Sequence, residues 1–358
     1  MDKTAVPFRA DRLTRAVDLL HAGVEAGAMP GGVVCLYRHG EPVLTEAFGL
    51  QDESRPVTAE TVYDLASLTK PMATASSIVT LVEQGRLVLG AALGTLLGSS
   101  VPEHLAKITV FQLLTHTSGI SSWTACYNNG IGLDAAVGAI FALPTPTAAP
   151  GTCYEYSCLN FILLARILLE LTGQTVENFA QENVFTPLGL NYLTFHPKTN
   201  LDRVAPTISR EGPDKDTALT GIVHDGNARG IEMQTGDVSG NAGLFGNAAD
   251  VAAFGEAIRT GRLFGPPTTA RVLTSQIPAS VGGHSLLFFA HPNGLCPSGD
   301  LFSDRAVGHS GYTGTVLLIE PAYDLTVAVL TNSVFGDGKA SWLILRRKFM
   351  NALAASLA

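Results

Sequence analysis

Apolar residues recur at two different periods along the chain. Between residues 9 and 27 they return at intervals of three and four, which predicts an amphipathic helix. The segment 31–49 instead holds two short β-rich runs on either side of the polar sequence Arg-His-Gly-Glu, the pattern of a β-hairpin. A second pair of such runs occupies 314–333, and a last apolar helix is expected over about 339–356.

The middle of the chain has the pattern of helices joined by Gly/Pro-rich connections. The candidate helices are 67–84, 157–172, 176–183 and 248–261. Strands joined by hairpins favour an antiparallel sheet. We therefore predict an α/β (α+β) fold, with an antiparallel sheet flanked by N- and C-terminal helices and a mostly helical inserted domain. The sheet domain is assigned to 1–75 and 265–358 and the helical domain to 76–264, with the active site between them.

Composition narrows the classes of function. The chain has 358 residues, of which 46% are hydrophobic and 15% charged, enough apolar material for a large core. With a formal charge of −8 and no basic run, the chain is not expected to bind nucleic acid or an anionic membrane surface. No segment is long and apolar enough to be expected to span a bilayer.

The cysteines predict free thiols rather than a disulfide framework. Their number is odd, and none forms a Cys-x-x-Cys pair. The five are Cys35, Cys126, Cys153, Cys158 and Cys296. Together with an N-terminal sequence that lacks the apolar region of a secretory signal, this pattern leads us to expect a cytoplasmic protein.

One short motif suggests covalent chemistry. Ser67 precedes Lys70 by three residues at the expected start of a helix, and Pro71 falls in its first turn, where a missing N–H matters least. Residues three apart share a helix face, so the lysine can reach the serine hydroxyl. A serine that caps a helix beside a solvated lysine gives the same pattern, and Ser-x-x-Lys alone does not decide between these readings.

Three further motifs follow in order. The sequence Leu-Thr-His-Thr-Ser-Gly surrounds His116, Tyr156 directly precedes a strongly apolar helix, and His-Ser-Gly occupies 309–311. Taken with Ser67 and Lys70, this order resembles the serine beta-lactamase and penicillin-binding protein superfamily, in its class C-like branch of esterases, D-amino-acid peptidases and transferases. The resemblance extends from about residue 10 to residue 335.

The resemblance implies specific roles. Ser67 would be the acylated nucleophile, Lys70 would assist its deprotonation, and Tyr156 would shuttle the proton. His309 would stand at the catalytic position of the third motif. The backbone N–H groups of Ser67 and Tyr312 would form the oxyanion hole.

Two residues depart from the family pattern. Cys158 stands where the family carries the Asn of Tyr-x-Asn, and a thiol is a poorer hydrogen-bonding group than an amide. His309 stands where beta-lactamases carry a lysine, although some D-peptide-cleaving relatives also have histidine there. A histidine is mostly neutral near pH 7. Both departures argue against strong beta-lactam recognition.

Other candidates are less specific. We assign Cys158, Trp123, Ser310 and Gly311 to substrate binding, although core packing also explains an aromatic residue such as Trp123. The segment 221–254 resembles esterase-like members that read His-Asp-x-Asn-Ala … Gly-His-Ala-Gly-Leu-Phe, with Asn241 in place of the second histidine.

No cofactor and no metal are expected. No dinucleotide or phosphate-binding fingerprint follows a predicted strand. His224 with Asp225 could ligate a metal, but no third ligand has a diagnostic spacing. His116 is expected to order a loop by hydrogen bonding.

The leading hypothesis is a serine hydrolase that forms an acyl-enzyme on Ser67 and acts as a carboxylesterase on small acyl esters. The alternatives are a D-amino-acid peptidase or weak beta-lactamase, and an inactive binding protein of the same fold. Its expected partner is a small-molecule ester or amide, and the sequence does not determine the oligomeric state.

Overall fold

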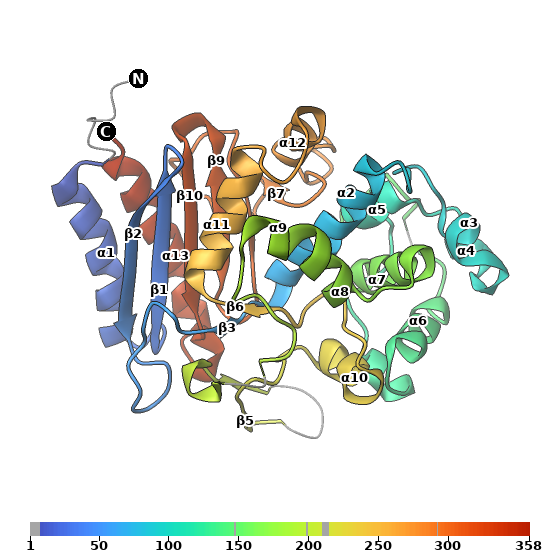
Figure 1. The fold of residues 1–358 in the computed structure, drawn as a ribbon, viewed down its shortest axis with the longest axis horizontal. Coiled ribbons are helices and arrows are strands. Elements are labelled where there is room, and N and C mark those ends of the chain that lie inside the picture. Colours follow the sequence, from blue (N-terminus) through green and yellow to red (C-terminus); the bar gives the residue numbers. More distant parts are fainter. Residues whose placement is uncertain (1–7, 147, 198–199, 210–214, 292) are drawn as a thin grey trace.

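The computed structural model describes residues 8–146, 148–197, 200–209, 215–291 and 293–358. Its centre is a six-stranded antiparallel sheet in the order β2-β1-β10-β9-β8-β7. The strands are β1 (Gly31–Arg38), β2 (Glu41–Gly49), β7 (Phe289–Ala290), β8 (Val307–Ser310), β9 (Val316–Glu320) and β10 (Leu325–Thr331). Strand β1 pairs with β10, so the two ends of the chain meet in the middle of the sheet (Figure 1).

Both predicted hairpins are present and pair as expected. Strands β1 and β2 are joined through His39 and Gly40, which adopt positive φ angles, and β9 and β10 are joined through Pro321–Asp324. Alternation along β10 explains why two layers cover the sheet. Val327 and Val329 face one hydrophobic cluster, while Ala328 and Leu330 face the other, as a period of two requires.

Helices cover both faces of the sheet. The first and last helices, α1 (Ala10–Glu25) and α13 (Lys339–Ser356), pack together on one face, close to their predicted bounds (Figure 1). Helix α11 (Ala248–Arg259) covers the other face, where Gly255 lies close to Leu317 and Thr326. The domain bounds predicted from sequence place α11 with the helical region, whereas its apolar face packs on the sheet.

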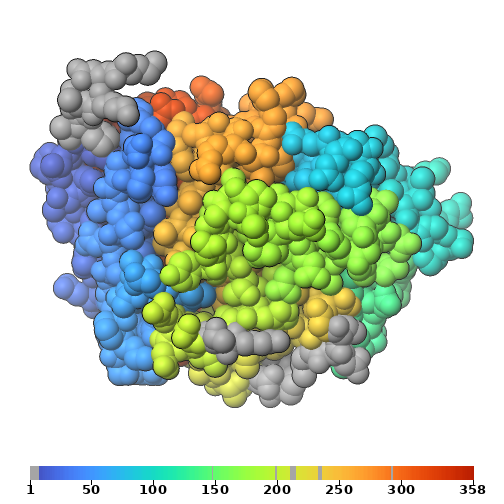
Figure 2. All heavy atoms as spheres, viewed as in Figure 1, coloured from blue at the N-terminus to red at the C-terminus, as the bar shows by residue number. Residues whose placement is uncertain are grey.

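The remaining helices form the second half of the molecule. They are α2 (Ser76–Glu83), α3 (Leu93–Leu97), α4 (Glu103–Ala106), α5 (Val110–Leu114), α6 (Leu133–Phe141), α7 (Cys158–Thr172), α8 (Val176–Ala180), α9 (Thr186–Leu188), α10 (Gly226–Thr235) and α12 (Pro266–Val272). Short two-stranded sheets join β3 (Tyr63–Asp64) to β6 (Phe245–Gly246) and β4 (Thr207–Ile208) to β5 (Ala218–Leu219). In the space-filling view, the green segment fills the middle of one face, between the blue N-terminal strands and the cyan helices (Figure 2).

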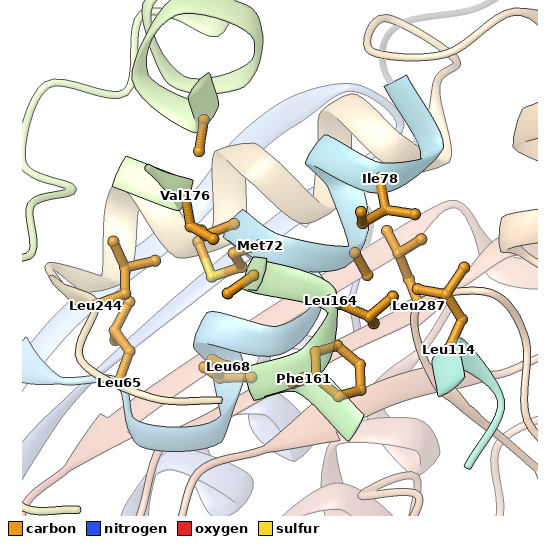
Figure 3. Packing of buried hydrophobic residues seen from close by; sticks show 14 of the residues in the cluster. Leu65, Leu68, Met72, Ile78, Leu114, Phe161, Leu164, Val176, Leu244 and Leu287 are labelled. Atoms are coloured by element: carbon orange, nitrogen blue, oxygen red, sulfur yellow. The ribbon is translucent and has the colours of Figure 1, made fainter. Parts of the chain in front are cut away.

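The predicted helix 67–84 is composite. A 3₁₀ turn (Ala66–Leu68) and a π-helical segment (Lys70–Ala75) precede α2. Pro71 has no N–H to donate to the carbonyl of residue 67, which accounts for the irregular start. Leu68 and Met72 from this segment pack beside Phe161 and Leu164 of α7 in the core, as Figure 3 shows.

Candidate active site

The composite helix places a lysine against a serine at its first turn. The Nζ of Lys70 donates to the Oγ of Ser67 over 3.0 Å and to the carbonyl oxygen of Asn241 over 2.8 Å. Lys70 is fully buried, so its ammonium is held inside the protein rather than in solvent. Ala66, immediately before the serine, has a φ of 47°, an uncommon conformation for a residue with a side chain. The structure therefore joins Ser67 and Lys70 as their spacing predicted.

The charge on Lys70 lacks a carboxylate counter-ion. No ion pair links Lys70 to an acidic side chain among the described residues, and its third contact is the Sγ of Cys158 at 3.4 Å. Burial lowers the pKa of Lys70, but the neighbouring Cys158 and Tyr156 raise the pKa by more, so that it lies above the ordinary value. The ammonium form of Lys70 is thus stabilised most when negative charge lies on these two neighbours.

Tyr156 lies on the other side of the serine and close to that cation. Its ring centroid is 5.1 Å from the Nζ of Lys70, within cation–π range. Burial raises the pKa of Tyr156, while the charge of Lys70 and hydrogen bonding to Ser67 and Lys70 lower it, and the net shift is upward. The resting tyrosine is thus a neutral phenol beside a group that favours its phenolate.

His116 fixes the segment that carries Tyr156. Its Nδ1 accepts from the backbone N–H of Ser157 over 3.0 Å, and its carbonyl accepts from the N–H of Glu155 over 2.9 Å. The imidazole is 4.6 Å from the Tyr156 ring, centroid to centroid. Burial, with the charges of His284 and Lys70, lowers the pKa of His116 well below the usual histidine value. A neutral imidazole whose Nδ1 accepts carries its proton on Nε2.

His309 is also a neutral, buried histidine. It lies near the end of β8, stacks on Phe289 at a centroid distance of 4.3 Å and donates from Nδ1 to the Ser310 carbonyl over 3.1 Å. Burial and the charge of Lys70 lower the pKa of His309 well below the usual value. This position therefore supplies no cation, in agreement with the sequence-based expectation for a histidine here.

The turn after β8 is tied to the loop that carries the serine. The Thr313 hydroxyl donates to the Asp64 carbonyl over 2.7 Å, and the Thr315 hydroxyl donates to the Leu65 carbonyl over 3.0 Å. A Cβ on Gly311 would overlap the Thr315 hydroxyl and the Leu65 carbonyl. Glycine is therefore required at this close approach.

This arrangement bears on the predicted oxyanion hole. Ser67 lies in the first turn of its helix, where backbone N–H groups have no intrahelical partner. Tyr312 directly follows Gly311 and lines the same pocket as Ser67. The two predicted N–H donors thus lie on segments that the threonine hydroxyls hold together, although their joint role stays a prediction.

Asp64 is a structural residue of the site that the sequence analysis missed. Its carboxylate accepts from the N–H of Ala66 over 2.8 Å and from the N–H of His224 over 2.7 Å. Burial raises the pKa of Asp64 to about 6, although these two hydrogen bonds lower it. An aspartate before a serine carries no periodic signal, so only the tertiary structure shows that it positions the nucleophile loop.

A pocket of about 220 Å³ opens over Ser67. Its lining residues are Ser67, Tyr156, Phe289, Leu295, Ser310, Gly311, Tyr312, Gly314, Lys339, Trp342, Leu343 and Arg346. The predicted substrate-binding residues Ser310 and Gly311 are among them. Cys158, which contacts Lys70, and Trp123 are not among them. Trp123 is 39% exposed with its ring 6.3 Å from that of Tyr127. The assignment of both residues to substrate binding stays a prediction.

The His-Asp-x-Asn-Ala segment serves local structure. The side chain of Asp225 caps α10 by accepting from the N–H of Ala228, and His224 stacks on Tyr312 at 5.5 Å. Asn241, at the position of the family's second histidine, presents its carbonyl to Lys70. Within the described ranges, no three His, Cys, Asp or Glu side chains are placed to hold a metal ion.

No single described helix has the length and apolar composition to cross a bilayer, whereas α7 and the segment Val176–Leu188, bent by 75°, pass that test only as a pair.

Comparisons with known proteins agree with this geometry. A putative D-alanyl-D-alanine carboxypeptidase of Escherichia coli K12 is 26% identical, over 91% of this chain and 83% of its own. An N-acetylmuramyl-L-alanine amidase of Bacillus subtilis 168 is 27% identical, over 91% and 82%. The solved structure of EstCE1, a hydrolase with promiscuous acyltransferase activity, superposes with a TM-score of 0.77 at 21% identity, covering 95% of this chain and 98% of that one.

The match is not confined to the motifs around Ser67. The model of the Beta-lactamase protein family matches residues 16–347, which include both chain ends that build the sheet and the whole helical region between them. Within this matched range Ser67 and Tyr156, which the resemblance singled out, line one pocket, and Lys70 contacts the hydroxyl of Ser67. The chain therefore belongs to the beta-lactamase family.

Proposed function

We propose that the protein is a serine carboxylesterase that cleaves small acyl esters through an acyl-enzyme on Ser67. The observation that carries the proposal is the pocket itself. Ser67, with its hydroxyl against Lys70, opens into a space of about 220 Å³ walled by Phe289, Trp342 and Leu343. Pockets for drug-sized ligands commonly measure about 300–1,000 Å³, so this one suits a short acyl group.

In the proposed mechanism, Lys70 acts through its charge. Tyr156, a neutral phenol at rest, first gives its phenolic proton to solvent water, and the ammonium ion of Lys70 stabilises the phenolate that remains. The phenolate then takes the proton from Ser67 as the hydroxyl oxygen attacks the ester carbonyl. The oxyanion would receive hydrogen bonds from the N–H groups of Ser67 and Tyr312. Tyr156 then gives its proton to the leaving alcohol. In the second half it takes a proton from water, whose oxygen attacks the acyl carbon, and returns the proton to Ser67.

Two residues favour esters over beta-lactams. His309 is neutral, so it offers no charge to the carboxylate of a beta-lactam at the family's lysine position. Cys158 supplies a thiol where an amide would hold an acylamino group, and one net hydrogen bond is worth about 0.5–1.5 kcal/mol. A small ester needs neither contact.

A D-amino-acid carboxypeptidase is the second candidate. It is favoured by the similarity to the putative D-alanyl-D-alanine carboxypeptidase of Escherichia coli K12 and by the histidine at position 309, which some D-peptide-cleaving members share. Peptide hydrolysis uses the same acyl-enzyme on Ser67, so the two candidates differ in the leaving group rather than in the nucleophile.

The test combines labelling with turnover. The folded protein is treated with a fluorophosphonate, and the modified peptide is mapped by mass spectrometry, with Ser67→Ala as the control. The kcat/KM is then measured for p-nitrophenyl butyrate, nitrocefin and a D-alanyl-D-alanine peptide. We expect a single label on Ser67 and the highest kcat/KM for the ester. A label on another serine would disprove the nucleophile, and faster peptide cleavage would favour the second candidate.

A further inference from the structure

One face of α13 forms a wall of the active-site pocket. Lys339, Trp342, Leu343 and Arg346 all line it, and they follow one another at intervals of three, one and three residues. That spacing puts them on a single helix face, which spans about 10 Å at 1.5 Å per residue. Two apolar side chains are thus flanked by one cation at each end.

Neither cation has an acidic partner among the described residues. Arg347, which does not line the pocket, pairs with Asp300 over 2.5 Å, whereas the described part of the chain offers no such ion pair to Lys339 or Arg346. The Nε of Arg346 is buried without a hydrogen-bond partner. The Lys339 ammonium lies over the ring of Tyr312 instead.

The surroundings of Lys339 and of Arg346 disfavour a positive charge at both positions. Lys339 is the first residue of α13, where the helix dipole disfavours a cation. Burial lowers the pKa of Lys339 to about 8 and also lowers the pKa of Arg346. The pocket lining contains no acidic side chain, and Asp337 lines only the adjoining hollow, which shares Lys339. Partly buried cations without partners are stabilised by an anion.

We propose that Lys339 and Arg346 bind a carboxylate of the substrate, so that the preferred esters carry a negative charge at the end remote from the scissile bond. The proposal rests on the proposed esterase function and names its substrate class. It places the anion site on α13, away from the neutral His309 on β8. The apolar side chains of Trp342 and Leu343 would contact the carbon chain between the ester and the carboxylate.

Matched pairs of esters test the preference. One pair carries the charge on the acyl side: mono-p-nitrophenyl glutarate against p-nitrophenyl valerate. The other carries it on the alcohol side: 4-carboxyphenyl butyrate against phenyl butyrate. We expect kcat/KM to favour the anionic member at least tenfold in one pair. No preference in either pair would overturn the proposal.

Substitutions on α13 then assign the preference to its residues. Lys339→Met and Arg346→Met should each reduce the anionic-to-neutral ratio several-fold, and Arg346→Glu should reduce it further, because it repels the carboxylate. Lys348→Met removes one charge from an exposed position of the same helix and should leave the ratio unchanged. If the Arg346 variants and Lys348→Met gave the same anionic-to-neutral ratio of kcat/KM, the positive charge would act only at long range. The assignment of the anion site to Arg346 would then be wrong.

A binding measurement separates this proposal from the catalytic one. In Ser67→Ala protein no ester can be turned over, so calorimetric titration with glutarate reports on the anion site alone. Glutarate should bind the Ser67→Ala protein and bind at least tenfold more weakly when Arg346→Met is added. If the esters are not hydrolysed but glutarate binds in this way, only the esterase function fails. If they are hydrolysed and glutarate binds both proteins equally, only the anion site fails.

Discussion

Three buried histidines should make this protein unstable in mild acid. His116, His284 and His309 are each at most 1% exposed. His116 and His309 lie beside the ring of Tyr156, and His284 lies beside His116. Burial lowers the pKa of His284 to about 4 and lowers the pKa of the other two well below 6.5. For each, the folded state binds its proton at lower pH than the unfolded state does. The stabilisation that the neutral histidines give to the folded state is therefore complete above about pH 6.5 and is lost as the pH falls.

The size of the effect follows from proton linkage. An unfolded histidine has a pKa of about 6.5, so between pH 7 and pH 5 each one costs the folded state about 2 kcal/mol, and three cost about 6 kcal/mol. Asp64 opposes this, because its pKa in the folded state is about 6. As the pH falls, Asp64 is protonated in the folded protein before it is protonated in the unfolded chain. This difference stabilises the folded state by about 1 kcal/mol between pH 7 and pH 5. The net loss of about 4–5 kcal/mol is a large part of a typical stability.

Urea unfolding measured at several pH values between 7.5 and 5 checks this expectation. The His284→Asn variant keeps a side-chain donor for the Ser285 carbonyl and removes one titrating group. The loss of unfolding free energy between pH 7 and pH 5 should therefore be about 2 kcal/mol smaller than in the wild type. A wild-type stability that is flat over this range, or an equal slope in His284→Asn, would refute the reasoning.

Three further outcomes are expected at the site. Tyr156→Phe should melt like the wild type and lose about 10²–10⁴-fold in kcat/KM for p-nitrophenyl butyrate, and near-normal turnover would remove it from proton transfer. Gly311→Ala should lose about 1–3 kcal/mol of stability and most turnover, because its Cβ overlaps the Leu65 carbonyl and the Thr315 hydroxyl, and a variant with normal melting and kcat would contradict that packing. Lys70→Met should abolish turnover without lowering the melting temperature, since it removes a buried cation, and a sharply lowered melting temperature would show that the charge stabilises the fold.

Local patterns were enough to predict most of the fold. Hairpins and amphipathic helices are encoded by residues near one another in sequence, and both hairpins and the two terminal helices form as predicted. Helix α11 shows the limit of this information. Its apolar face is the same whether it packs on helices or on a sheet, so its sequence could not show that it covers β10 and β1.

The catalytic candidates were predictable for a different reason. Ser67 and Lys70 are separated by one helical turn, so local geometry alone joins them. The threonine hydroxyls that hold the nucleophile loop act over sequence separations of 249 and 250 residues, and such pairs leave no periodic trace. The cations of α13 were hidden because the sequence does not show which face of the last helix meets the pocket.

The charge of Lys70 links the expected loss of stability in acid to the proposed proton transfer. Lys70 is buried with two oxygen acceptors and a thiol around it, and none of the ion pairs in the described part of the chain reaches it. Its charge is therefore balanced most strongly when an anion develops on Tyr156 or Ser67, which is the state that the proposed proton transfer would pass through. A protonated histidine beside it would oppose that balance. Because His116 and His309 are neutral, the charge of Lys70 acts mainly on Ser67 and Tyr156. The same low pKa values that keep these histidines neutral make the folded state less stable in acid.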